Sequence, residues 1–316
     1  LGITIFIGTV LITGGQIELL PLLVLFMFST QIYGPILAIL SQLTSLFHLG
    51  TVTNRMRTLL TTPAMEGEDK DVSKYDIELK NVTFGYNQDD VIKDVSFSIP
   101  AGSVTALVGP SGSGKSTAAS LICRFWDITE GQICLGGVPL NQIPLSDLMS
   151  QISFVTQNTF LFKKSIRENI MMGNPEATEK EMMQAAKDAI CHDFIMRLPK
   201  GYDTVIDKET KLSGGEKQRI TLARAILKNA PVVILDEATA YIDADNEDLL
   251  QKALAKLSEE KTVLVIAHRL SSIKEADSIV VLEQGEVIDC GTHDELMKKN
   301  GLYHKLFHIQ QESLGW

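Results

Sequence analysis

Cysteine is scarce in this chain and basic charge is in deficit, and both shortages narrow the possible functions. Four cysteines occur among the 316 residues, and no two of them form a Cys-x-x-Cys pair: Cys123, Cys134, Cys191 and Cys290. Disulfide frameworks and cysteine metal sites use closer spacings, so we expect buried, reduced thiols. The formal net charge is −10, whereas a nucleic-acid-binding face should be basic. We therefore expect no nucleic-acid partner.

Formal charge is also nearly absent from residues 1–54, where Glu18 is the one charged side chain. The apolar run Leu1–Thr13 would form about 20 Å of helix, which is short of a hydrocarbon core of about 30 Å. The basic start and small-residue cleavage site of a signal peptide are lacking. We expect this run to be the second half of a membrane helix in a truncated membrane protein.

The segment Leu19–Asn54 carries no formal charge and would extend roughly 54 Å as a helix. We expect Leu19–Leu40 to span the membrane and the helix to continue beyond the lipid. The alternative is a buried helical hairpin of a soluble protein, but soluble helices of this length normally show a charged face. Arg55 and Arg57 follow the segment, so the positive-inside rule predicts that this end is cytoplasmic.

A glycine-rich segment follows in the polar part of the chain, between the β-prone run Val104–Val108 and a helix-prone stretch. Its spacing is that of a phosphate-binding loop. Glycines let the backbone fold around phosphates, and amides at a helix start attract anions. Lys115 is predicted to reach the β- and γ-phosphates and Ser116 to ligate Mg²⁺. The candidate residues are Gly109, Pro110, Ser111, Gly112, Ser113, Gly114, Lys115, Ser116 and Thr117.

Downstream, the apolar run Val232–Leu235 ends in the carboxylates Asp236 and Glu237. Such a run suits a strand buried on both faces of a partly parallel sheet. Asp236 can bind magnesium, directly or through water, and Glu237 is the candidate base for an attacking water. An isolated Asp-Glu pair can simply cap a strand end, but together with the phosphate-binding loop it indicates a nucleoside triphosphatase.

The segment Leu212–Glu216, with the sequence Leu-Ser-Gly-Gly-Glu, lies between these motifs. Ser213 and Glu216 have the spacing of a capping box, which predicts a helix over Lys217–Lys228. A capping box does not call for the two glycines, each of which costs a helix about 1 kcal/mol relative to alanine. Their presence indicates that the backbone here approaches another molecule closely.

In this order, the motifs resemble the ATP-binding domain of ABC transporters, and the apolar segment ahead resembles the exporter type, with membrane and ATPase parts in one polypeptide. The resemblance implies that Mg-ATP is sandwiched between two such domains. It assigns Ser213, Gly214, Gly215 and Glu216 to the γ-phosphate of ATP held by the opposite subunit. It also implies that Gln157 senses the metal and γ-phosphate, that His268 contacts the γ-phosphate and that Tyr86 stacks on adenine. Taken alone, these three would be a surface glutamine, a structural histidine and a packing residue.

The implied fold is an α/β P-loop ATPase domain with an antiparallel β-subdomain around Tyr86 and a helical subdomain near 158–228, preceded by all-α transmembrane helices. We expect 1–62 to be the end of the transmembrane domain, 63–75 a linker and 76–316 the ATP-binding domain. Four membrane helices would be missing. The expected location is the bacterial plasma membrane, in contact with lipid, with the ATP-binding domain in the cytoplasm.

The expected partner is a second half-transporter, in a homodimer or a heterodimer. The solute and its direction do not follow from the resemblance, because exporter-shaped importers of siderophores belong to the family. Two segments depart from the family pattern: 240–243 has Tyr241 at a position expected to cross the dimer interface, and 207–211 lacks glycine. The alternative is a soluble or regulatory ABC ATPase not coupled to transport. The apolar start of the chain and the lack of a long coiled coil between the motifs argue against the soluble forms.

Overall fold

The computed structural model describes residues 2–62, 65, 67–68, 70, 72–87, 89–156, 159–207, 212–236, 252–267 and 269–314. They fall into two compact units, Leu1–Ala64 and Met65–Trp316, which are described separately. The division between the units lies inside the linker expected at 63–75. The limits 1–62 and 76–316 stay predictions.

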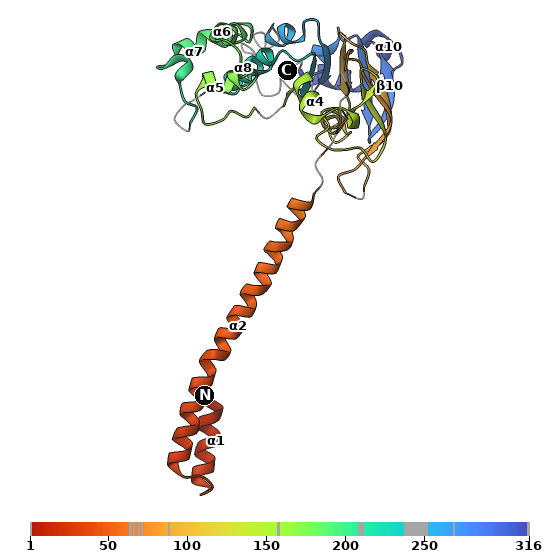
Figure 1. Cartoon of the computed structure of the whole chain (residues 1–316). Helices are drawn as coiled ribbons and strands as arrows, with labels where there is room; N and C mark the ends of the chain where they lie inside the picture. The colour runs from red at the N-terminus through yellow and green to blue at the C-terminus, as the bar shows by residue number, and fades with distance from the viewer. Residues whose placement is uncertain are drawn as a thin grey trace. The chain divides into compact units, whose positions relative to one another are not determined.

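The first unit is a helical hairpin, in which α1 (Gly2–Thr13) lies beside the beginning of α2 (Leu19–Thr61) (Figure 1). The helices approach closely at Gly8, where an added Cβ would lie 2.5 Å from Leu22 Cδ1. Small residues permit such close packing between membrane helices. Among the described residues, α2 is the one helix long and apolar enough to cross a membrane, and its apolar window is not buried.

The second unit is built on a six-stranded sheet of order β10-β9-β3-β8-β7-β6. The strands from β9 to β6 pair in parallel and β10 pairs antiparallel with β9. Neighbouring residues of β7 face different cores, since Ile234 packs toward the antiparallel sheet and Leu235 toward the helices. This confirms the predicted strand buried on both faces. The strands are β3 (Val104–Val108), β6 (Ile152–Val155), β7 (Val232–Asp236), β8 (Thr262–Ile266), β9 (Ser278–Glu283) and β10 (Glu286–Gly291).

A smaller antiparallel sheet, of order β2-β1-β4-β5, covers one face of the main sheet. Its inner residues share a core with α3 and with β7, β8 and β9. This sheet ends beside Tyr86, so the expected antiparallel subdomain is present. Its elements and the adjoining helices are β1 (Ile77–Phe84), β2 (Ile92–Ile99), β4 (Glu130–Leu135), β5 (Val138–Pro139), α3 (Lys115–Ile122), the 3₁₀ helix η1 (Leu140–Gln142) and α4 (Leu145–Gln151).

Helices cover the rest of the main sheet in two groups, which lie on different sides of this unit (Figure 1). The first group shares a second core with β7 and β8, and it matches the predicted helical subdomain. It comprises α5 (Ile166–Met171), α6 (Glu179–Asp188), α7 (His192–Arg197), η2 (Gly201–Asp203) and α8 (Gly214–Lys228). The second group packs on β3 and β9 in a third core. It comprises η3 (Leu270–Ile273), α10 (His293–Lys298) and α11 (Leu302–Leu314).

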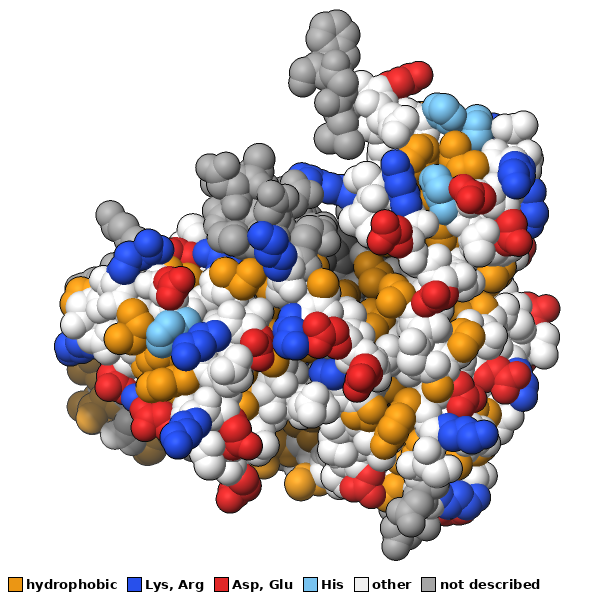
Figure 2. All heavy atoms as spheres, turned by 90° about the horizontal axis from the view of Figure 1, so that it is seen from above, with side chains coloured by type: hydrophobic (Ala, Val, Ile, Leu, Met, Phe, Trp, Pro, Cys, Tyr) orange, Lys and Arg blue, Asp and Glu red, His pale blue; other side chains and the backbone are white. Residues whose placement is uncertain are grey.

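Charge is distributed evenly over the face of this unit that Figure 2 presents. There, acidic and basic side chains lie next to one another, with small apolar areas between them, and do not form a field of one sign. A surface of this kind offers no broad electrostatic attraction to a polyanion.

Candidate nucleotide-binding site

The phosphate-binding loop connects β3 to α3, which is the strand-loop-helix context that the sequence predicted. Gly114 is the N-cap of α3 and has φ 99°, in the region that favours glycine. Gly109 is required for a different reason, because an added Cβ would lie 2.0 Å from the backbone oxygen of Leu282 in β9. The loop's glycines are therefore needed by the fold of this chain itself.

Lys115 lies inside the loop and is only 7% exposed. Its ammonium donates hydrogen bonds to the carbonyl oxygens of Gly109 (2.9 Å) and Pro110 (2.8 Å) and to Ser113 Oγ (3.3 Å). The cation is thus held beside the N-terminus of α3, where the backbone amides add positive potential. A cavity of about 200 Å³ opens here, lined by Val91 and by loop residues 111, 112 and 114–117. A positive, glycine-lined cavity fits an anionic phosphate chain.

The two predicted nucleotide motifs meet at one contact. Ser116 Oγ donates a hydrogen bond to Asp236 Oδ1 at 3.3 Å, across 120 residues of sequence. A hydroxyl and a carboxylate are oxygen ligands of the kind that Mg²⁺ takes together with phosphate oxygens and water. Ser116 and Asp236 therefore fit a magnesium ion as two of its oxygen ligands. Among the described residues there is no cluster of three or more His, Cys, Asp or Glu that could hold a metal.

Tyr86 lies in the loop after β1 and is 46% exposed. Its ring meets Phe84 and Trp126 edge-to-face, with centroids 5.0 and 5.3 Å apart. Its hydroxyl lies 3.4 Å from Thr117 Oγ1, at the start of α3. Tyr86 is therefore a packing residue that is also exposed beside the phosphate-binding loop, and its adenine role stays a prediction. The sequence analysis missed Trp126.

The signature segment 212–216 caps α8 through the predicted capping box. Ser213 Oγ accepts from the Glu216 amide at 3.2 Å, and Glu216 Oε2 accepts from the Ser213 amide at 2.8 Å. The helix begins at Gly214, three residues before the predicted start at Lys217, because the capping box itself forms the first turn. Gly214 is exposed, and an added Cβ would meet no atom within 4 Å. Nothing in the described part of the chain requires glycine there.

Three predicted site residues, Gln157, Glu237 and His268, lie outside the described residues, as do 208–211 and 237–251. Their assigned roles stay predictions that depend on the family resemblance. The strands that lead to them are in place, since β6 ends at Val155, β7 at Asp236 and β8 at Ile266. Because these strands are parallel, their carboxyl ends lie at the same edge of the sheet as the phosphate-binding loop.

A partly buried hydrogen-bond cluster connects the signature helix α8 with the segment that follows Gln157. Arg224 donates to the Asn169 carbonyl oxygen (2.8 Å), to Asn169 Oδ1 (3.0 Å) and to the Phe160 carbonyl oxygen (3.3 Å). Asn169 is fully buried, and its amide also donates to the Phe162 carbonyl oxygen at 3.0 Å. Burial lowers the pKa of Arg224. No sequence pattern predicted this cluster, because Asn169 and Arg224 are 55 residues apart.

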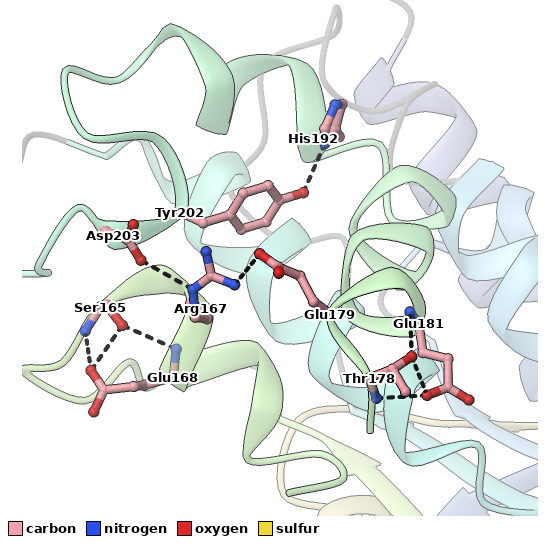
Figure 3. Close-up of polar contacts among 9 residues, drawn as sticks. All are labelled: Ser165, Arg167, Glu168, Thr178, Glu179, Glu181, His192, Tyr202 and Asp203. Atoms are coloured by element: carbon pink, nitrogen blue, oxygen red, sulfur yellow. Dashed lines mark hydrogen bonds and ion pairs between the residues drawn. The ribbon is translucent and has the colours of Figure 1, made fainter. Parts of the chain in front are cut away.

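Polar contacts at the surface join the elements of the helical subdomain (Figure 3). Arg167 of α5 bridges Glu179 (2.5 Å) and Asp203 (3.0 Å). Further capping boxes begin α5 and α6, and backbone hydrogen bonds lower the pKa of their glutamates, Glu168 and Glu181. Exposed ion pairs contribute little to stability, so we expect these contacts to add little to the stability of the fold.

The cysteines agree with the sequence prediction at three positions, where the thiols are free and buried. Burial raises the pKa of Cys123 and of Cys191 to about 12. The prediction was wrong for Cys290, which is exposed on the edge strand β10. A larger cavity, of about 550 Å³, lies between the end of α3 and β4, and no residue of the phosphate-binding loop lines it.

Comparison with known proteins identifies the family of the ATP-binding unit. Residues 92–240 match the family described as ABC transporter. The chain is 49% identical over 235 residues to the ATP-dependent lipid A-core flippase of Syntrophus aciditrophicus, covering 74% of this chain and 39% of that protein. It is 42% identical over 315 residues to the mycobactin import ATP-binding/permease protein IrtA of Mycolicibacterium smegmatis, covering 98% of this chain and 37% of that protein. The chain thus spans about two fifths of the length of these relatives.

A solved structure of a bacterial Atm1-family ABC exporter with ATP bound superposes with a TM-score of 0.76 and 35% identity. The superposition covers 93% of this chain and 53% of that one. This chain therefore belongs to the ABC transporter family and carries its ATP-binding domain. More narrowly, its relatives are ATP-binding/permease proteins of the exporter type, which confirms the predicted fold class and implies a membrane location.

Proposed function

We propose that this chain is part of an exporter-type half-transporter, in which two ATP-binding domains hydrolyse Mg-ATP and thereby drive a solute across the membrane. The observation that carries the proposal is the contact between Ser116 and Asp236, which brings the phosphate-binding loop to the carboxylate strand end. The matched relatives include proteins named for flipping, drug export and import, so the proposal leaves the solute and its direction open.

The phosphates, the magnesium ion and the attacking water each have a candidate partner in this chain. Lys115 and the amides at the start of α3 would bind the phosphates, and Ser116, Asp236 and Gln157 would hold magnesium. Bound magnesium neutralises charge on the β- and γ-phosphate oxygens. Glu237 would accept a proton from the attacking water, and His268 would contact the γ-phosphate.

The signature segment supports a role for a second half-transporter. Ser213 and Gly214 are exposed, and Gly214 has no neighbour in the described chain that requires glycine. A backbone with open space around it can approach ATP bound to another subunit closely. We therefore assign this segment to the nucleotide of the partner, in a homodimer or a heterodimer.

The first unit supports attachment to the membrane. The apolar window of α2 is unburied, and the mycobactin-import relative aligns over 98% of the chain, which includes residues of this unit. We assign the hairpin to the bacterial plasma membrane and the ATP-binding unit to the cytoplasm, because Arg55 and Arg57 lie near the end of α2. A soluble or regulatory ATPase is not favoured, because such a protein does not need this hairpin.

The variant Glu237→Gln, in the full-length protein reconstituted in lipid, tests the proposal. It should bind ATP as the wild type does but hydrolyse it at least about 100-fold more slowly, because the general base is lost while Asp236 remains. Steady-state ATPase activity and nucleotide retention measure the two effects. Glu176→Gln, an exposed change in the helical subdomain, is the control and should behave as wild type. Near-normal turnover of Glu237→Gln would remove this residue from the proposed role.

A further inference from the structure

We infer that Gln310 of the C-terminal helix α11 is a positioning residue for ATP hydrolysis. It acts through the backbone that follows His268, the histidine predicted to contact the γ-phosphate. The inference rests on the proposed function and adds to it an element that none of the nucleotide motifs includes. Gln310 Oε1 accepts a hydrogen bond from the Leu270 amide at 2.8 Å, across 40 residues of sequence. Leu270 is two positions after His268.

This hydrogen bond satisfies a helix-end amide from another element. Leu270 is the first residue of η3, and the N-cap residue Arg269 makes no side-chain cap bond. The first amides of a helix have no partner within the helix itself. Gln310 supplies an acceptor to one of them, so the start of η3 is tied to α11.

Gln310 also faces the phosphate-binding loop. A cavity of about 190 Å³ lies between α11 and the loop, and its wall combines residues of three segments. These are Gly109, Ser111 and Lys115 of the loop, Ala267 and Leu270 in the segment from the end of β8 to the start of η3, and Leu306 and Gln310 of α11. The glutamine amide is uncharged, so it can hold the backbone beside this cavity without repelling a triphosphate.

The helix that carries Gln310 is well anchored. Tyr303 and Phe307 are buried in one core with Leu270 and Ile273, so α11 and η3 pack directly on each other. The Tyr303 hydroxyl lies 2.7 Å from His293 Nδ1 of α10, which fixes the start of α11. A polar group presented from a rigid, packed element holds its partner more exactly than one on a loop.

The role predicts a specific kinetic signature. The adenine side of the site and the loop contacts of Lys115 do not depend on Gln310, so ground-state binding of ATP should persist. Loss of the hydrogen bond should lower kcat with little change in KM, because the segment around His268 acts on the reacting phosphate.

Three variants of the full-length protein test this. Gln310→Met keeps the side-chain length but has no oxygen acceptor, and we expect kcat to fall about three- to tenfold, as for one lost hydrogen bond, with KM within about twofold. Gln310→Glu keeps an acceptor and should retain wild-type kcat, while its charge beside the phosphate cavity raises KM. Gln311→Met, the neighbouring exposed position on α11, is the matched control and should match wild type.

Amide hydrogen exchange of the peptide that contains Leu270 provides a second readout. It should be faster in Gln310→Met than in wild type and unchanged in Gln311→Met. The inference is overturned if Gln310→Met keeps wild-type kcat, if Gln310→Glu loses as much kcat as Gln310→Met, or if the exchange rate is unaffected. A wild-type protein without ATPase activity would instead overturn the proposed function and this inference together.

Discussion

The phosphate-binding loop and the signature segment are both glycine-rich, but their glycines have different causes. In the loop, Gly109 is pressed against the Leu282 backbone and Gly114 has a positive φ, so the chain's own fold explains them. In the signature segment, Gly214 is surrounded by open space and its helix would accept alanine. A glycine that the fold does not require points to a partner molecule.

The polar residues of the loop and of the signature segment differ in the same way as their glycines. Lys115 is buried and has three acceptors within its own loop, so it is preorganised before any ligand binds. Ser213 is exposed, and its hydroxyl and amide form the two hydrogen bonds of the capping box with Glu216. The phosphate-binding loop is thus preorganised to bind phosphate by itself. The signature segment is a capped helix end that leaves Ser213 and Gly214 accessible to another subunit.

The largest expected effect is on ATP trapping, when the loop is mutated in one subunit of a dimer and the signature segment in the other. If both segments serve one composite site, Lys115→Ala and Ser213→Arg damage opposite halves of it. Either mutant homodimer then has two damaged sites, whereas a mixed dimer keeps one intact site. We expect mixed dimers of the full-length protein to trap ATP at one site, while each parent traps it poorly. Retained nucleotide per purified dimer is the measurement.

Verified assembly of the mixed dimer is the control for this experiment. If such dimers trap no more nucleotide than their parents, the two segments do not meet across an interface of identical chains. Trapping is a better readout than turnover, because two coupled sites need not cycle singly.

Alanine at the two kinds of glycine sharpens the comparison. Gly109→Ala places a methyl group against a backbone oxygen and should destabilise the unit by about 2–4 kcal/mol. Gly214→Ala should leave stability within about 1 kcal/mol, or raise it, because alanine favours the helix. Thermal unfolding measures both, and nucleotide trapping by the Gly214→Ala dimer should fall although the fold is intact. If the Gly214→Ala dimer traps nucleotide normally, the partner's nucleotide does not approach Gly214 closely.

Tyr86 lies beside the phosphate-binding loop, so changing it tests the loop's part in binding ATP. Tyr86→Ala should raise the KM for ATP about tenfold or more with little change in kcat, since stacking on a base is worth about 1–3 kcal/mol and is equal in ground and transition states. Tyr86→Phe, which keeps the ring and loses the contact with Thr117, should stay close to wild type. An unchanged KM in Tyr86→Ala would leave Tyr86 as a packing residue against Phe84 and Trp126.

The smallest expected effect on ATPase activity comes from labelling the thiol of Cys290, which lies outside both segments. A maleimide at pH 7 should label Cys290 in the native protein, while Cys123 and Cys191 react only after unfolding, because burial and a pKa of about 12 leave almost no accessible thiolate. Labelling should leave ATPase activity unchanged. Mass spectrometry of the labelled peptides checks this, and native labelling of Cys123 or Cys191 would contradict the buried positions.

Local patterns in the sequence predicted the elements that carry the site. The apolar run at 104–108 is strand β3 with the predicted limits, and the run at 232–235 lies in β7, which extends to Asp236. The Ser213–Glu216 spacing is a capping box, although the helix begins at Gly214 and not at Lys217. These predictions succeed because burial of a strand, the first turn of a helix and a glycine-rich turn each depend on residues a few positions apart.

Only the tertiary structure decided which distant groups meet. The sheet order puts β9 beside β3, so Leu282 presses on Gly109. It also fixes the contacts of Arg224 with Asn169 and of Gln310 with Leu270, which join residues 55 and 40 positions apart. Such pairs leave no periodic trace in the sequence, because the two partners lie on different elements and neither belongs to a local pattern. Their meeting depends on how the helices pack on a sheet whose strands are not in chain order.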